Sequence, residues 1–335
     1  MGNIEAEPTI RRKERYQTDM TTLTREKTQA APNHRPVMVA EMLIAMSAMP
    51  GGSYIDCNLG DGGHTEAILK TAHGARVLGI DLDKEALERS VSRLRRWSHQ
   101  VELCHGNFAD VYAVARNTHH VPVCGILFDL GVSSSQLDTP ERGFSFRHDA
   151  RLDMRFDPST GPTAYDIVNR WPQSKLEELI GDLGEEPRAG RVARGIVRNR
   201  RIETTGELAK VVTKALNWPA HSRSHPATRT FQALRMAVNG EMENLERGLS
   251  EAVKALQPKG RLVVISYHSI EDRLVKGFIR KSSSGCTCPP LLPECICDET
   301  PTLRPIGKGV IKPTISEVRT NPRARSAKMR VAERV

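Results

Sequence analysis

The feature that most constrains the fold is a glycine-dense turn between an apolar run and a helical pattern, at residues 54–65 with the sequence YIDCNLGDGGHT. Glycine lacks a Cβ, so Gly60, Gly62 and Gly63 can adopt positive φ and bring backbone amides close to a ligand at the N-terminus of the next helix. Asp81 ends the next apolar run about 20 residues later, a spacing that suits ribose hydroxyls. Together they predict a nucleoside-binding edge of a sheet, whereas the turn alone would be compatible with simple chain reversal.

The glycine pattern separates two classes of nucleoside-binding site. The dinucleotide fingerprint requires G-x-G-x-x-G, but the sixth position counted from Gly60 is Thr65, and that counted from Gly62 is Ala67. This counts against a nicotinamide-dependent oxidoreductase. The D-x-x-x-G-x-G pattern formed by Asp56, Gly60 and Gly62 resembles the class I S-adenosylmethionine-dependent methyltransferases instead.

Apolar runs of strand length alternate with helical patterns in two blocks of the chain, which predicts an α/β fold with a parallel sheet. The expected strands cover residues 54–57, 76–80, 101–104, 125–129 and 261–267. Between Asn239 and Pro258, apolar residues recur on one helical face. We therefore expect a helix directly before the last of these strands.

The fourth expected strand ends at Asp129 and the next begins only near Leu262, much further along than an ordinary α/β connection allows. The pattern between them is helical, with one apolar face made of Leu176, Leu179, Ile180 and Leu183. We therefore predict an inserted helical domain at residues 134–225 and a discontinuous sheet domain at residues 34–133 and 226–335.

Composition favours a soluble protein with a polyanionic partner. The chain has 335 residues, 39% of them hydrophobic, and a formal net charge of +9, so it can bury a core and attract nucleic acid. No apolar run approaches the roughly 18 residues of a membrane span, and residues 1–31 lack the apolar middle of a signal peptide. We expect a cytoplasmic protein with a disordered tail at residues 1–33.

One segment of the insertion concentrates the positive charge, because it holds Arg188, Arg191, Arg194, Arg198, Arg200 and Arg201 without any acid. On a helix, all of these except Arg200 would lie within an arc of about 140°. A solvated face would usually intersperse acids, so we predict that Arg188, Arg191, Arg194, Arg198 and Arg201 contact phosphates.

A second basic run lies between Arg319 and Arg334, with Arg323, Arg325, Lys328 and Arg330. Two basic surfaces could bind one RNA. If about five of these side chains each neutralise a phosphate, the logarithm of the affinity for single-stranded RNA should fall with the logarithm of salt concentration at a slope near −3.5. A flat salt response would contradict this.

Cysteine usage indicates a reducing compartment. Cys57, Cys104 and Cys124 lie in or beside apolar segments, where a free thiol behaves as a small core residue. The other four flank a proline-rich turn: Cys286, Cys288, Cys295 and Cys297. Four thiolates could complete a zinc site, but the C-x-C spacing is tighter than the usual C-x-x-C, so a solvent-facing loop is the alternative. We therefore assign no metal ligand among the site residues, and the sequence leaves open whether these four cysteines bind zinc.

Several long motifs then occur in a fixed order. They are HRPVM at 34–38, GGH at 62–64, DLGVSSSQLD at 129–138, RGFSF at 142–146, LDMR at 152–155, HPATRTFQA at 225–233, SYHSIEDR at 266–273 and NPRARS at 321–326. Together they resemble the bacterial small-subunit ribosomal RNA cytosine-N4 methyltransferases of the RsmH or MraW type, from His34 to Arg334. Lys259 and Tyr267 depart from that pattern, which leads us to expect glycine and phenylalanine there.

The resemblance implies a class I Rossmann-like methyltransferase sheet with an inserted helical domain, S-adenosylmethionine as methyl donor, and a cytidine of the ribosomal decoding region as acceptor. Carried onto this sequence, the cofactor contacts fall on Gly62, Gly63, His64, Asp81, Phe108, Asp129 and Gln136. Asp81 would accept from the ribose, Phe108 would pack on adenine, and the turn would hold the amino-acid end of the donor. Without the resemblance, Phe108 would be assigned to ordinary core packing.

Asp129 is the candidate catalytic residue, first as a cofactor contact and second as a group that orients the N4 amine, although an acid at a strand end can be purely structural. His225 and Arg229 are expected to contact RNA or the other domain, because transfer from an activated donor does not require a strong base. Phe144, Phe146 and Phe231 could stack on RNA or be buried between the domains.

The expected partner is small-subunit ribosomal RNA, either naked or in the assembled 30S subunit, and the sequence leaves the oligomeric state open. Two rival functions follow from the same residues. One is the nicotinamide-dependent oxidoreductase, which the missing third glycine disfavours. The other is a ribosome-assembly factor that binds RNA through the arginines without catalysing any transfer.

Overall fold

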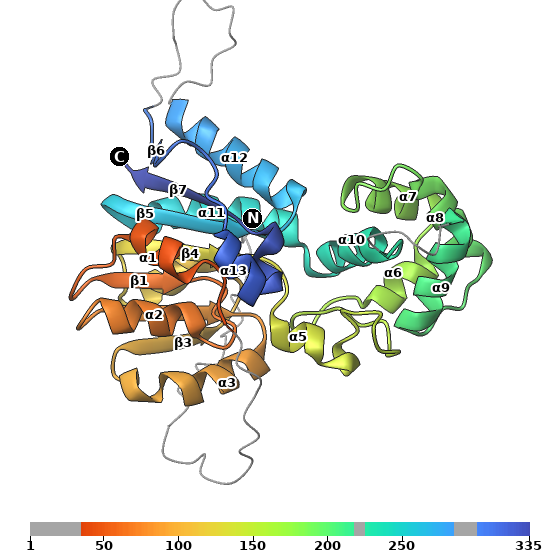
Figure 1. Ribbon diagram of the computed structural model, residues 1–335, viewed down its shortest axis with the longest axis horizontal. Helices are drawn as coiled ribbons and strands as arrows, with labels where there is room; N and C mark the ends of the chain where they lie inside the picture. Colours follow the sequence, from red (N-terminus) through yellow and green to blue (C-terminus); the bar gives the residue numbers. More distant parts are fainter. Residues whose placement is uncertain (1–34, 218–224, 285–299) are drawn as a thin grey trace, which may run out of the picture. The chain divides into compact units, whose positions relative to one another are not determined.

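The computed structural model of the chain describes residues 35–217, 225–284 and 300–335. The predicted disordered tail at residues 1–33 and the cysteines Cys286, Cys288, Cys295 and Cys297 lie outside the described residues. In the described part, the strands form one mixed sheet in the order β3-β2-β1-β4-β5-β7-β6 (Figure 1). The strands are β1 (Ser53–Asp56), β2 (Arg76–Asp81), β3 (Val101–His105), β4 (Val123–Asp129), β5 (Leu256–Ser266), β6 (Leu303–Pro305) and β7 (Lys328–Arg334).

Strands β1 to β5 run parallel, and the order of the strands reverses between β1 and β4. Ile55 of β1 is in register with Leu78 of β2 and Ile126 of β4, and all three side chains are fully buried. The predicted α/β fold with its parallel strands is therefore confirmed, although β5 begins earlier than expected, at Leu256. Where the order reverses, the loops after β1 and β4 diverge and leave a crevice at the carboxyl ends of the strands.

Both faces of the sheet are covered by helices, because successive side chains of a strand point to opposite faces. Tyr54 packs in one hydrophobic cluster and the adjacent Ile55 packs in another. The first cluster includes residues of α1 (Val39–Met46), α2 (Gly63–Thr71) and α3 (Lys84–Leu94). The second includes residues of α4 (Val111–Asn117), α11 (Glu241–Ala255) and α12 (Ser269–Ser284). Helix α11 confirms the helix expected between Asn239 and Pro258.

The C-terminal part of the sheet was not predicted. Strand β7 is antiparallel to β5 and pairs with β6, after the short helix α13 (Ile315–Thr320). In this arrangement Lys328 and Arg330 bind Asp272, at 3.2 and 2.6 Å. Arg323 binds Asp138 at 2.8 Å. The sequence places only Glu333 among these cations, whereas the fold pairs three of them with acids from distant segments.

The segment after β4 is helical as predicted. Its helices are α5 (Ser134–Asp138), α6 (Ala164–Arg170), α7 (Gln173–Asp182), α8 (Ala189–Arg198) and α9 (Thr205–Leu216), followed by α10 (Thr228–Asn239). Figure 1 shows α7, α8 and α9 packed together. Capping boxes at Thr163 and Thr204 start α6 and α9, since each side chain accepts from a backbone N–H three residues later.

A third hydrophobic cluster fills this helical segment. It contains the predicted apolar face of α7, with Leu176 and Ile180 fully buried. Phe231 and Leu234 of α10 also belong to it, so α10, which follows the expected boundary at residue 225, packs with the insertion. By their contacts, residues His34–Val335 form one compact unit. None of the helices in the described part of the chain is long and apolar enough to cross a membrane.

Candidate active site

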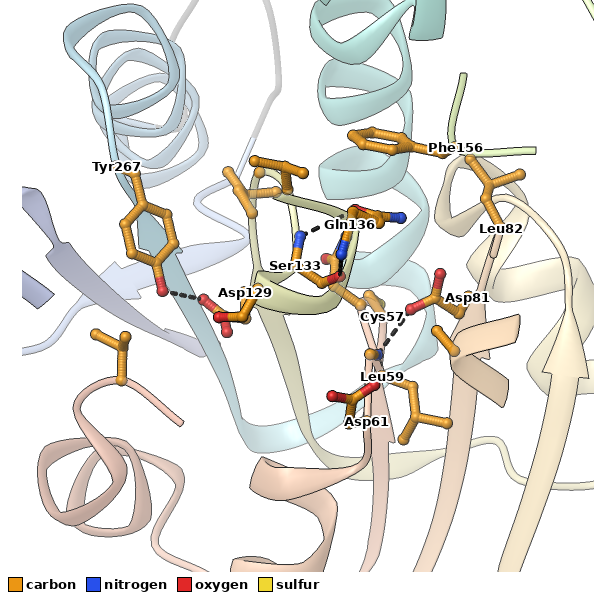
Figure 2. A pocket seen from close by; sticks show the side chains of 18 of the residues that line it. Cys57, Leu59, Asp61, Asp81, Leu82, Asp129, Ser133, Gln136, Phe156 and Tyr267 are labelled. Carbon is orange, nitrogen blue, oxygen red and sulfur yellow. Dashed lines mark hydrogen bonds between the residues drawn. The ribbon is translucent and has the colours of Figure 1, made fainter. Parts of the chain in front are cut away.

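A cavity of about 300 Å³ opens at the carboxyl ends of β1, β2 and β4, where the strand order reverses. Figure 2 shows Asp81 and Asp129 in its wall, together with Gln136 and Tyr267. Of the residues predicted to bind the cofactor, those that line the cavity are Gly63, His64, Asp81, Phe108, Asp129 and Gln136. Gly62 does not line it.

The glycine turn has the left-handed backbone that glycine permits, with φ of +52° at Gly60 and +78° at Gly62. A Cβ at Gly60 would meet no atom within 4 Å, which leaves its backbone open to the cavity. Gly62 instead faces α3, where a Cβ would lie 3.0 Å from Leu94. At Gly63 a Cβ would lie 2.3 Å from Pro36, so the missing side chain allows the segment before α1 to close over the turn.

Asp81 ends β2 and fixes the turn that precedes it. Its Oδ2 accepts from the backbone N–H of Gly60 at 2.7 Å, and its Oδ1 accepts from that of Asp83 at 2.8 Å. Burial raises the pKa of Asp81 to about 6, although these two donors favour the ionised form. Each carboxylate oxygen keeps one further acceptor direction for a ligand hydroxyl.

Asp129 ends β4 and is held from two sides. The hydroxyl of Tyr267 donates to its Oδ1 at 2.8 Å (Figure 2). Its Oδ2 lies 3.5 Å from Nδ1 of His64, the second residue of α2. Burial raises the pKa of Asp129 to about 6, while His64 and the Tyr267 hydroxyl act in the opposite direction. Because 22% of its side chain is exposed, the carboxylate can contact a ligand in the cavity.

Gln136 connects the loop after β4 to the start of α3 by hydrogen bonds. In the capping box of α5, its Oε1 accepts from the backbone N–H of Ser133 at 2.9 Å. Its Nε2 donates to Oδ2 of Asp83 at 2.8 Å, and Arg142 donates to the same oxygen at 3.0 Å. Asp83 also caps α3, since its Oδ1 accepts from the N–H of Glu85. Gln136 therefore fixes the loop after β4 in place.

Two phenylalanines form apolar parts of the cavity wall. Phe108 packs edge-on against Phe128 of β4 with ring centroids 5.5 Å apart, so it is both a core residue and a wall residue. Phe156 stacks on Phe144 at 5.6 Å and also lines the cavity. Sequence reasoning missed Phe156, since it lies in an irregular segment with no periodic signal.

Four further wall residues were not predicted: Arg235, Tyr267, His268 and Glu271. The last three follow β5, and the rule that ligands bind at the carboxyl ends of parallel strands would have found them. Arg235 comes from α10 and had no signal in the sequence. Its guanidinium binds Glu241 through Nε at 2.7 Å and through Nη2 at 2.9 Å.

The side chains of Glu241, His268 and Glu271 lie close enough to hold a metal ion, with ligand atoms within 4.8 Å of one another. Each of these side chains already faces a charged partner, although Nε2 of His268 has no hydrogen-bond partner among the described residues. Arg235 binds both oxygens of Glu241, and Nε2 of His268 lies 2.9 Å from Oε1 of Glu271. Since the guanidinium occupies the place of a cation, we assign no metal to this group.

The predicted arginine face is shorter than expected, and none of its residues lines the cavity. Helix α8 ends at Arg198, so placing Arg201 on its face was wrong. Arg200 donates to the carbonyls of Val168 and Trp171 at the end of α6, so its side chain is bound within the insertion. Arg201 then donates to the hydroxyl of Tyr165 at 2.5 Å.

Arg188 precedes α8, donates to the carbonyl of Leu216 at 3.0 Å and is half-buried. Arg191, Arg194 and Arg198 are exposed, lie on one face of α8, and form no ion pair with any residue that the structure describes. These three arginines, which we call the α8 arginine face, are the part of the predicted basic surface that remains available to a polyanion.

The motif at 225–233, which includes the first turns of α10, packs within the insertion. The exposed ring of His225 lies 4.4 Å from the ring of Phe146, which also contacts Phe231 at 4.9 Å. Phe144 and Phe231 are 7% and 5% exposed, which favours packing over stacking on RNA. The half-exposed Arg229 lies 3.6 Å from the carboxylate of Glu186.

Comparison with known proteins gives one consistent result. The model of the MraW methylase family matches residues 31–335. A Dehalococcoides mccartyi protein named ribosomal RNA small subunit methyltransferase H is 50% identical over 303 residues, covering 90% of this chain and 86% of that protein. The protein of the same name from Thermomicrobium roseum is 48% identical over 306 residues, covering 90% and 94%. That of Pelobacter propionicus is 46% identical over 310 residues, covering 90% and 98%.

Proposed function

The chain belongs to the MraW methylase family, and from this premise we propose that it transfers a methyl group from S-adenosylmethionine to the exocyclic N4 of a cytidine in the decoding region of small-subunit ribosomal RNA. The names of its relatives support ribosomal RNA as the substrate. The choice of cytidine N4 is supported by the motifs of the sequence, such as DLGVSSSQLD at 129–138.

One observation carries the proposal: the glycine turn, Asp81 and Asp129 meet on a single cavity where the strand order reverses. The donor groups of S-adenosylmethionine, its ribose hydroxyls and its ammonium, match the acceptors of this wall. Oδ1 of Asn58 is buried, belongs to a wall residue, and accepts no hydrogen bond from the described residues. Leaving such an acceptor unpaired costs about 1–3 kcal/mol, so a ligand rich in donors fits.

When bound, S-adenosylmethionine supplies a methyl group on a positively charged sulfur. The chain supplies the binding groups. In our proposal Asp81 accepts from the ribose hydroxyls, Phe108 packs against the adenine, and Gly63 and His64 border the amino-acid end. Gln136 acts by fixing the loop after β4, and Gly62 acts by shaping the turn.

The acceptor amine must be placed in line with the methyl carbon at about 3–3.5 Å. A paired base cannot do this, so the cytidine has to leave its stack at a cost of a few kcal/mol. The lone pair of N4 is shared with the ring, and an acceptor aimed at an N4 hydrogen localises that pair. We assign this role to Asp129, whose carboxylate lines the cavity, and expect Asp129→Ala to lower the methylation rate by orders of magnitude while the protein stays folded.

We further propose that residues 134–225 together with α10 form the RNA-recognition part of the molecule. Support comes from their separate hydrophobic cluster and from the unpaired cations of the α8 arginine face. His225, which is exposed just before α10, and Arg229, which is half-exposed in its first turn, are proposed to add contacts at the edge of this part. Arg188 and Arg201 are weaker candidates, because both already donate to groups of the insertion.

The decisive experiment combines binding and product analysis. Purified protein is titrated with S-adenosylmethionine by calorimetry, and then incubated with labelled donor and either naked small-subunit RNA or 30S subunits from cells that lack this protein. We expect donor binding, label in one of the two substrates, and N4-methylcytidine in the nucleoside digest by mass spectrometry. Label in the 30S subunit alone would identify the assembled particle as the substrate.

Each rival function has its own outcome. Binding of a nicotinamide dinucleotide instead of S-adenosylmethionine would favour an oxidoreductase. RNA binding without transfer of label to either substrate would indicate an assembly factor. Transfer to a base other than cytosine would support a methyltransferase activity but contradict the assignment of cytidine N4.

A further inference from the structure

Tyr267 follows β5, and its side chain reaches Asp129 in the cavity wall (Figure 2). Its hydroxyl donates to Oδ1 of Asp129 at 2.8 Å, although the two residues are 138 positions apart. Its backbone N–H donates to Oε2 of Glu271 at 2.8 Å. The side chain is therefore anchored at its base and at its tip, and one oxygen of Asp129 has a fixed partner.

The second oxygen of Asp129 faces His64, with Nδ1 of His64 3.5 Å from Oδ2. The other ring nitrogen, Nε2, lies 2.9 Å from the carbonyl oxygen of Val37. A carbonyl oxygen only accepts, so Nε2 carries a hydrogen, and in the neutral ring Nδ1 carries none. A proton placed on Oδ2 would therefore have an acceptor beside it.

We propose that Tyr267 is a positioning residue for methyl transfer: by holding Oδ1 of Asp129, it directs Oδ2 to take the proton that the acceptor amine releases. Methylation of a primary amine forms one N–C bond and breaks one N–H bond, while the electrons of the methyl–sulfur bond stay on sulfur. One proton therefore leaves nitrogen for each methyl group gained. Oδ2 takes this proton and shares it with Nδ1 of His64. The identity of the amine rests on the proposed function.

The surroundings of Asp129 make its protonation sensitive to a single hydrogen bond. Burial raises the pKa of Asp129 to about 6, and the carboxylates of Asp56 on β1 and Glu271 on α12 act in the same direction. The hydroxyl of Tyr267 opposes them in either state of the His64 ring, and His64 opposes them once its ring is protonated. Removing the hydroxyl therefore takes away the donor that favours the ionised carboxylate while the His64 ring is neutral.

The hydroxyl of Tyr267 keeps its proton throughout the working range. Burial and the nearby carboxylates of Asp129, Glu271 and Glu317 raise the pKa of Tyr267 well above its ordinary value. It therefore remains a donor to Asp129. Other titratable or charged side chains in the same wall are Cys57, Asp61, Asp81, Arg235, His268 and Arg323.

The test is the pH dependence of single-turnover methylation in Tyr267→Phe, a change that removes only the hydroxyl. We expect the wild-type rate to rise with pH through a midpoint near pH 6, as Asp129 ionises. Loss of one hydrogen bond to a charged group should move this midpoint up by about one pH unit. The variant should be about five-fold slower at pH 6 and equal to wild type at pH 8.

The matched control is Tyr54→Phe. The hydroxyl of Tyr54 is buried in the sheet and accepts from the backbone N–H of Met49 at 2.8 Å, and Tyr54 does not line the cavity. Its profile should keep the wild-type midpoint. Two results for Tyr267→Phe would overturn the proposal: an unchanged profile, or a rate lowered by the same factor at every pH.

A second readout does not depend on turnover. The carboxyl 13C signal of Asp129, identified by its absence in Asp129→Asn, is titrated by NMR in the protein without donor or RNA. Its midpoint should be higher in Tyr267→Phe than in wild type, and equal midpoints would refute the positioning role. If the protein methylates no cytidine, the proposed function fails while this titration still reports whether Tyr267 controls Asp129.

Discussion

The backbone N–H of Gly60 donates to Oδ2 of Asp81 at 2.7 Å, so the glycine turn after β1 and the acid that ends β2 form one structural unit. The turn requires a left-handed φ at Gly60, and the acid requires a donor because it is buried. The N–H of Gly60 therefore supplies the donor that the buried carboxylate requires, and the carboxylate holds the turn at Gly60 in place. The pair forms one side of the proposed nucleoside site.

Removing the carboxylate of Asp81 should weaken donor binding more than it affects the fold of the sheet. In Asp81→Ala, the ribose hydroxyls lose a charged acceptor worth roughly 1.5–3 kcal/mol, so the Kd for S-adenosylmethionine should rise at least ten-fold in calorimetry. Glu88→Ala is the control, because Glu88 is exposed on α3 and does not line the cavity. An unchanged Kd in Asp81→Ala would remove this residue from the site.

The pKa of Asp81 also predicts a pH dependence of stability. It is about 6 in the folded protein against 3.8 as its ordinary value, so between about pH 4 and 6 the folded state holds a proton that the unfolded chain has lost. Stability from this group is therefore lost as the pH rises through that window. The free energy of unfolding of Asp81→Asn, relative to wild type, should increase by up to about 3 kcal/mol from pH 4 to 6.5.

Denaturant titrations at several pH values would measure this difference. Asp149→Asn provides a control of opposite sign, because hydrogen bonds from Thr204 and Gly206 lower the pKa of Asp149. That carboxylate contributes stability above its ordinary pKa and loses it as the pH falls. The prediction for Asp81 fails if its difference is flat with pH, or slopes as that of Asp149 does.

The α8 arginine face should account for part of the affinity for RNA. Replacing Arg191, Arg194 and Arg198 together by alanine removes three exposed cations without changing the buried face of α8. If each contacts a phosphate, the salt slope for single-stranded RNA should become less steep by about 2. Fluorescence anisotropy at several salt concentrations measures the slope.

A matched triple variant of exposed arginines outside the insertion, Arg95, Arg116 and Arg280 to alanine, keeps the net charge equal. An equal loss of slope in both triple variants would mean that total charge, and not the α8 arginine face, governs binding. Five phosphate contacts would give a slope near −3.5, but Arg188 and Arg201 are already bonded within the insertion. For the remaining three contacts we expect the less steep slope of about −2.

Lys259 occupies a left-handed backbone position near the start of β5, with φ of +66°. Glycine adopts this conformation without strain, whereas a side chain with a branched Cβ resists it by roughly 1–2 kcal/mol. We expect Lys259→Gly to be more stable than Lys259→Val by about that amount in chemical denaturation. At Arg261, an ordinary position of the same strand, the order of glycine and valine should reverse. The same order at both positions would mean that backbone strain is not the cause.

Much of the architecture followed from local sequence pattern. Five strands were expected within a few residues, because each is a short apolar run bounded by turn residues. Strand β7 was missed, since Lys328–Arg334 carries Lys328, Arg330 and Arg334 among its residues. Its charges are tolerated because Asp272 binds Lys328 and Arg330. A local sequence pattern cannot predict a partner that lies so far away in the chain.

In the candidate site, too, some features could be predicted from the sequence and others could not. The sequence by itself determined the glycine turn, the acids that end β2 and β4, and the existence of a helical insertion, because these depend on residues close together in the chain. Only the tertiary structure decided that Tyr267 binds Asp129, that Arg200 donates to the carbonyl of Val168, and that Asn321 donates to the carbonyl of Arg35. The physical reason is that directional hydrogen bonds between distant residues form only after the apolar core has fixed the backbones that carry them.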